Sequence, residues 1–118
     1  SVLTTHSASP IAVVASSVDL GSATAWQAGS FAGGIISIPT GSTLTSLTFY
    51  HSDTEDGTYL PLHDASGTAT TLTCAADKSY VQPQDCNSAV HLKVVGNAAG
   101  TINGLERLYD LRLFFIAV

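Results

Sequence analysis

Residues 44–63 carry the sequence LTSLTFYHSDTEDGTYLPLH, which decides the fold class of this chain. Residues 44–51 alternate between two faces, and an alternation with a period of two is typical of a half-buried strand. Residues 52–58 are polar and contain the turn-forming pair Asp56-Gly57. Residues 59–63 then return as a second strand, so the stretch predicts an antiparallel β-hairpin.

Turn residues recur about every 8–12 residues along the rest of the chain, as in all-β proteins. Only residues 105–108 suggest a helical turn. We therefore expect one all-β domain, a single antiparallel β-sandwich that is jelly-roll-like and spans residues 11–118, preceded by an extended N-terminal arm at residues 1–10. Its further strands are predicted at residues 11–15, 35–38, 69–74, 79–81, 89–95 and 109–118.

The composition is poor in charge and bounds the partners. Charged residues make up 11% of the 118 residues and the formal net charge is −5, whereas about 25% is usual in soluble domains. Four scattered basic residues do not form a surface that could follow nucleic-acid phosphates, so no nucleic-acid partner is expected. The longest apolar run, residues 113–118, is about a third of the ~20 residues that a membrane-spanning helix needs, so no membrane partner is expected either.

The acidic turn at residues 53–57, DTEDG, has the composition of a calcium loop but not its spacing. A calcium-binding EF-hand loop has Gly at its sixth position and a late Glu. Here Gly57 is fifth and no Glu follows it at the required distance. We therefore interpret the turn as a solvated hairpin turn rather than a metal site.

Other motifs for catalysis or cofactor binding are lacking. Two of the four histidines, His51 and His63, flank the hairpin and could approach each other, but no HxH or HExxH spacing occurs. No GxSxG motif marks a nucleophile, and the Gly-rich residues 29–34 contain no Lys for a phosphate. We predict no catalytic, metal or cofactor site and no enzymatic activity. The other two histidines are His6 and His91.

Three further residues each leave two interpretations open. Cys74 and Cys86 could form a disulfide, which would contribute about 3 kcal/mol, or remain two buried reduced thiols. Trp26 could pack in the core or an interface, or it could stack on a ligand as part of a sugar-binding surface.

Residues 49–62, FYHSDTEDGTYLPL, have the pattern strand, Ser-x-x-x-x-Gly-Thr-Tyr, strand. This hairpin resembles that of small β-sandwich proteins from tailed bacteriophage virions, and residues 80–83 and 91–97 continue the resemblance in the same order. Similar hairpins occur in carbohydrate-binding sandwiches, many of which carry a Trp where this chain has Thr58-Tyr59. The resemblance implies a structural virion protein, and most closely a capsid decoration (cement) protein with no catalytic residues.

A decoration protein of this kind would be made in the host cytoplasm and would lie on the outer capsid surface. It would bind the major capsid protein, and it is expected to be a homo-oligomer, with a trimer at a local symmetry axis favoured. The expected contacts with the capsid or with other subunits come from the arm and the apolar end of the chain: Val2, Leu3, His6, Pro10, Phe114, Phe115, Ile116 and Val118.

Two alternatives remain open at the level of sequence. One is a carbohydrate- or receptor-binding module of a phage head fibre or tail fibre, which would use Trp26. The other is a secreted bacterial adhesin-like domain, which would contain the Cys74–Cys86 disulfide.

Overall fold

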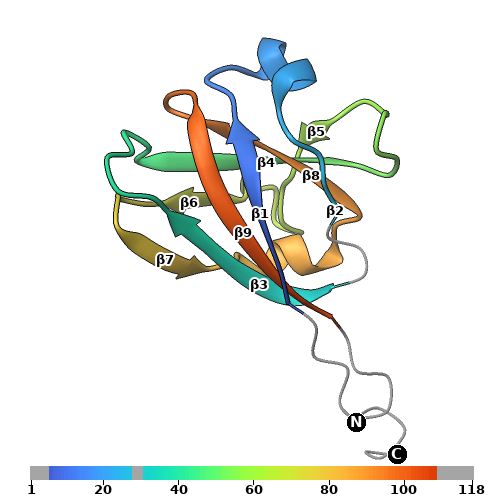
Figure 1. The fold of residues 1–118 in the computed structure, drawn as a ribbon. Helices are drawn as coiled ribbons and strands as arrows, with labels where there is room; N and C mark the ends of the chain where they lie inside the picture. The colour runs from blue at the N-terminus through green and yellow to red at the C-terminus, as the bar shows by residue number, and fades with distance from the viewer. Residues whose placement is uncertain (1–5, 28–30, 109–118) are drawn as a thin grey trace, which may run out of the picture.

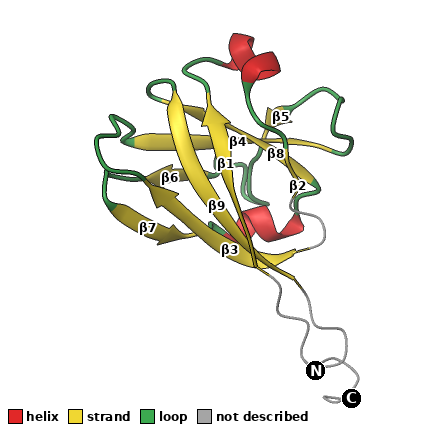
Figure 2. Ribbon diagram, viewed as in Figure 1, coloured by secondary structure: helices red, strands yellow, loops and turns green. Residues whose placement is uncertain are grey.

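Strands dominate the computed structural model, which describes residues 6–27 and 31–108 (Figure 2). No helix in these two ranges is long and apolar enough to cross a membrane. The elements in chain order are β1 (His6–Val13), the 3-10 helix η1 (Ser17–Ser22), β2 (Trp26–Gln27), β3 (Phe31–Ile38), β4 (Ser46–Ser52), β5 (Leu60–Pro61), β6 (Thr71–Thr73), β7 (Lys78–Val81), the 3-10 helix η2 (Gln84–Ser88), β8 (His91–Gly96) and β9 (Gly100–Leu108).

The strands form two antiparallel sheets that pack as a β-sandwich, which confirms the predicted all-β class (Figure 1). The first sheet has the order β1-β9-β3-β7. The second has the order β2-β8-β4-β5, with β6 also paired to β4. Neighbouring strands are mostly distant in the chain, so the fold is held by non-local pairing.

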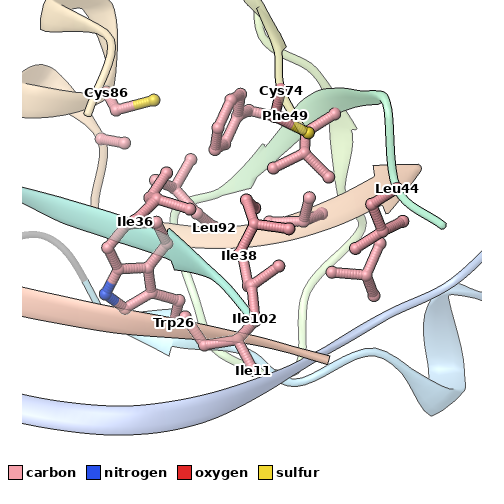
Figure 3. Packing of buried hydrophobic residues seen from close by; sticks show 14 residues of the cluster. Ile11, Trp26, Ile36, Ile38, Leu44, Phe49, Cys74, Cys86, Leu92 and Ile102 are labelled. Atoms are coloured by element: carbon pink, nitrogen blue, oxygen red, sulfur yellow. The ribbon is translucent and has the colours of Figure 1, made fainter. Parts of the chain in front are cut away.

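The core lies between the two sheets because apolar residues alternate along their strands. In β4, Leu47 and Phe49 are fully buried, while Thr48 and Tyr50 between and after them are only half-buried. In β8, Leu92 and Val94 are buried in the same way. Figure 3 shows Phe49 and Leu92 of this sheet close to Ile36 and Ile38 of the opposite sheet. The core cluster consists of Ile11, Val13, Trp26, Ile36, Ile38, Leu44, Leu47, Phe49, Cys74, Cys86, Ala89, Leu92, Val94 and Ile102.

The predicted hairpin at residues 44–63 is confirmed with shorter strands. Strand β4 begins at Ser46, and β5 contains only Leu60 and Pro61, which pair with His51 and Tyr50. The polar turn between them is longer than predicted because Tyr59 lies outside β5, buried at 9% exposure, with its hydroxyl donating to the Glu55 carbonyl within the turn. The predicted strands at residues 35–38, 79–81 and 89–95 correspond to the second half of β3, to β7 and to β8.

The prediction of a helical turn at residues 105–108 is wrong, because these residues belong to the long strand β9. Gly104, directly before this stretch, faces the core, where a Cβ atom would come within 2.7 Å of Ile11 Cδ1 and 3.6 Å of the Trp26 ring. A glycine inside a strand often marks such a close approach.

The boundary predicted between arm and sandwich at residue 10 is also wrong. Strand β1 begins at His6, and its register with β9 runs from His6 opposite Arg107 to Val13 opposite Gly100. Pro10, which lacks an N–H group, is compatible with this strand because β1 is an edge strand. Val2, Leu3 and the strand predicted at residues 109–118, with Phe114, Phe115, Ile116 and Val118, lie outside the described residues.

Candidate binding surface

Trp26 lies in the core and does not form a ligand-stacking surface. It is 4% exposed and pairs with Leu92 through the β2–β8 ladder. Its ring packs beside Gly104 and among the core residues that Figure 3 shows. The stacking role is therefore wrong, and core packing, the other interpretation, is confirmed.

Cys74 and Cys86 are free, buried thiols, so the disulfide is not formed in this structure. Cys74 follows β6 and Cys86 lies in η2. Burial raises the pKa of both thiols, and that of Cys86 rises to about 12 with a smaller contribution from the neighbouring Asp85 carboxylate. Because the thiolate is the reactive species, neither side chain is suited to act as a nucleophile at neutral pH.

The raised pKa values of these thiols predict that the protein loses stability in alkali. Below the ordinary thiol pKa of 9.0, Cys86 is protonated in both states. Above it the unfolded thiol loses its proton while the folded one keeps it, so the free energy of unfolding should fall by up to about 1.4 kcal/mol per pH unit until the folded pKa is reached. Urea unfolding between pH 8 and 11 measures this slope. A Cys86→Ala variant should show a shallower slope, and an equal slope in the variant would contradict the assignment.

The acidic turn is closed by hydrogen bonds between its own residues. Ser52 Oγ donates to the Thr54 carbonyl (2.6 Å), and the Tyr59 hydroxyl donates to the Glu55 carbonyl (2.8 Å). The carboxylates of Asp53, Glu55 and Asp56 belong to exposed residues. Nowhere in residues 6–27 and 31–108 do three His, Cys, Asp or Glu side chains gather in a way that could hold a metal ion.

Lys93, on the outer face of the second sheet, contacts both the same turn and η1. This β8 side chain lies 4.7 Å from the centre of the Tyr59 ring and donates from Nζ to the Leu20 carbonyl (2.8 Å). Burial raises the pKa of Tyr59, and the Glu55 and Asp56 carboxylates add to the shift. The turn and η1 therefore cover part of this face. Sequence analysis missed the role of Lys93, because its partners are far away in the chain.

His51 and His63 lie beside the same pocket at the hairpin, as their positions in the sequence suggested. His51 and His63 line one shallow pocket of about 170 Å³ together with Asp53. His51 Nε2 lies 3.8 Å from an Asp53 oxygen, whereas His63 Nδ1 lies 3.0 Å from the Pro61 carbonyl oxygen. Each histidine thus has its own local partner, and the two do not converge on a common ligand. His91 lies in β8, and His6 pairs opposite Arg107.

The central part of the outer face of the first sheet is different, because short uncharged side chains cross it in a row. Its central row crosses all four strands in register: Pro10 lies opposite Asn103, Asn103 opposite Ser37, and Ser37 opposite Ser79. The two serine hydroxyls are 2.8 Å apart and hydrogen-bonded. Beside this row Ile35 pairs with Val81, which is 74% exposed.

This face is the candidate binding surface, defined here by Pro10, Ala12, Ile35, Ser37, Ser79, Val81, Thr101 and Asn103. None of these eight side chains is charged. A partner that covered them would not bury an unpaired charge, which is the most costly event in forming an interface. Of the predicted contact residues, only His6 and Pro10 fall within the described ranges, and Pro10 lies on this face.

Comparison with known proteins adds no assignment. No protein-family model matches the chain, and neither a curated protein nor a solved structure is significantly similar to it.

Proposed function

We propose that this chain is a capsid decoration protein of a tailed bacteriophage, which binds the outer surface of the major capsid protein shell through the candidate binding surface. The observation that carries the proposal is the row of uncharged side chains that crosses the four paired strands of the first sheet. Such a face suits recognition by shape and by hydroxyl and amide hydrogen bonds. The residues on which the alternatives drew give them no support, since Trp26 is buried and the two thiols are free.

The strand order adds support from fold architecture. If β5 and β6 are counted as one strand, the orders β1-β9-β3-β7 and β2-β8-β4-β5 are those of a jelly roll, in which the chain alternates between two sheets as two Greek keys. Jelly rolls are common in viral capsid and lectin domains. We therefore propose the jelly roll as the topology of this sandwich, in keeping with a virion protein.

The size of the face favours several copies acting together. Four strands about 4.8 Å apart and roughly 20 Å long cover about 400 Å², which is half of the ~800 Å² that one partner contributes to a standard interface. A homo-oligomer, a trimer in the simplest case, would present several such faces at once and gain affinity by linking them. Bound copies would stabilise the shell by mass action, because they bind the assembled form better than free subunits.

The proposal is tested with phage heads that lack the chain. Heads should release their DNA at a lower temperature without it, and addition of the purified protein should restore the temperature of intact heads. A fluorescent dye that reports exposed DNA measures this directly. Identical release temperatures with and without the protein would overturn the proposal.

A further inference from the structure

The two side edges of the sandwich differ in how their backbone groups are satisfied. At the β1 edge, the Ala12 amide donates to Thr24 Oγ1 (2.9 Å) and the Thr24 amide donates to the Ala12 carbonyl (3.3 Å). The Val14 amide donates to Val94 of the other sheet (3.3 Å). The backbone groups of Pro10, like those of Ala12 two residues later, point away from β9, and Pro10 has no N–H group. This edge is therefore closed from Pro10 to Val14.

The β7 edge is open in the described part of the chain. The Gln82 amide, directly after β7, donates to the Gly34 carbonyl of β3 (2.9 Å). Because successive strand residues direct their backbone groups to opposite sides, Ser79 and Val81 point their N–H and C=O groups away from β3. No described strand pairs with β7 on that side. Unprotected edges of this kind are templates for an added strand.

Three apolar side chains from β7 and from the β5–β6 part of the second sheet are only partly covered. Leu62 and Leu72 come from the β5–β6 edge of the second sheet, and Tyr80 comes from β7. All three are only partly buried although they pack against the core. A strand added beside β7 would place one set of its side chains next to Tyr80, on the core side, and the other set next to the exposed Val81.

Residues 113–118, LFFIAV, have the composition that such a strand needs. They are apolar at every position, so both faces of the added strand would be apolar. Six residues in extended form span about 20 Å, which is enough to pair with all four residues of β7.

The distances favour the segment of a second copy over the chain's own. Leu108 pairs with Phe31, whereas Val81 pairs with Ile35 further along β3. Reaching the far side of β7 from Leu108 means crossing three strand spacings, about 14 Å, and running back at least about 10 Å along β3, a diagonal of roughly 18 Å. The five steps from residue 108 to residue 113 cover at most about 18 Å when fully straight. This leaves no length for a turn if all of residues 113–118 are to lie along β7 of their own chain.

We propose that residues 113–118 of one copy add as an antiparallel strand to the open edge of β7 in a second copy, so that head-to-tail contacts close a ring. The contact joins two different surfaces, and a heterologous contact of this type gives a closed ring when its rotation allows. The inference rests on the proposed function for the expectation of a homo-oligomer, and it names the contact that holds the copies together.

The test uses the full chain and substitutions on each side of the contact. Val81→Pro removes an N–H group that β3 does not use, so the sandwich should remain folded while the edge is blocked. Val81→Thr keeps the N–H group and the branched shape and serves as its control. Phe115→Asp places a charge in the added strand. Light scattering after size-exclusion chromatography gives the mass, and hydrogen exchange reports on the Val81 amide.

The wild-type chain and Val81→Thr should have a mass that is a multiple of 12.1 kDa, whereas Val81→Pro and Phe115→Asp should fall to 12.1 kDa with unchanged circular dichroism. The Val81 amide should be protected in the wild type and exchange at least tenfold faster in Phe115→Asp. A monomeric wild type overturns the inference, with a protected Val81 amide then assigning the edge to the chain's own segment. An oligomer that survives Val81→Pro also overturns it. Shell binding is therefore measured with Phe115→Asp, because Val81 belongs to the candidate binding surface. Shell binding by the folded monomeric Phe115→Asp variant would support the decoration function without the strand contact. A wild-type oligomer that does not bind shells would support the strand contact without the decoration function.

Discussion

Asn103→Glu is expected to weaken binding to phage heads by about 100-fold, equivalent to roughly 3 kcal/mol, with little change in the stability of the free protein. Asn103 is exposed at the centre of the candidate binding surface, between Pro10 on β1 and Ser37 on β3. A carboxylate there stays solvated in the free protein. Under a docked shell it would lose its water without gaining a partner. Co-sedimentation of the labelled protein with heads measures the change.

The matched control is Thr71→Glu. Thr71 is also exposed and also lies in a strand, but it belongs to β6 on the second sheet, away from the candidate binding surface. It adds the same charge to the protein, so it corrects for long-range repulsion from the shell. Binding should stay within about threefold of the wild type. An equal loss in both variants would point to net charge alone, and no loss in Asn103→Glu would remove this face from the contact.

Gly96→Ala is expected to lower the free energy of unfolding by about 1–3 kcal/mol through overpacking. Gly96 ends β8 where three neighbours converge, and a Cβ atom would lie 2.8 Å from Leu44 Cδ2, 3.0 Å from Val13 Cγ1 and 3.0 Å from the Ala98 carbonyl oxygen. The backbone oxygen cannot rotate away. The Gly96 amide also donates to the Val14 carbonyl (2.8 Å), so relaxation here would disturb the link between the sheets.

Gly21→Ala provides the control for this substitution. A Cβ atom at Gly21, in η1, would meet nothing within 4 Å, so the change should stay within about 0.5 kcal/mol. Urea unfolding gives both values, provided that the slope of the transition is the same in each variant. Equal midpoints for wild type and Gly96→Ala would mean that β8 and β1 do not approach as closely as described.

Local alternation was sufficient to predict the strands with regular patterns. Strand β4, with Leu47 and Phe49 inward, and strand β8, with Leu92 and Val94 inward, both follow the period of two that their sequences display. Strand β9 was missed because Gly100, at its start, is a residue type typical of turns. The reason for Gly104, the proximity of Ile11 and Trp26, lies in residues far away in the chain. The first half of β1 was missed because its partner is β9.

The candidate binding surface illustrates the same limit. Pro10, Ser37, Ser79 and Asn103 are individually ordinary, and only the register of β1, β9, β3 and β7 brings them into one row. A single sequence does not determine that register. Whether Trp26 and the two thiols are buried also depends on which strands pair. The shortage of charged residues is visible in the composition, but the gathering of these uncharged side chains into one row is not.

A reconstruction of the native phage head tests the central claim most directly, provided that it resolves the two sheets, which in a sandwich are about 10 Å apart. The account predicts a small sandwich on the outer head surface, standing on its β1-β9-β3-β7 sheet with Asn103 and Ser37 against the major capsid protein. A head surface without this density, or a sandwich that stands on the β2-β8-β4-β5 sheet, would contradict it.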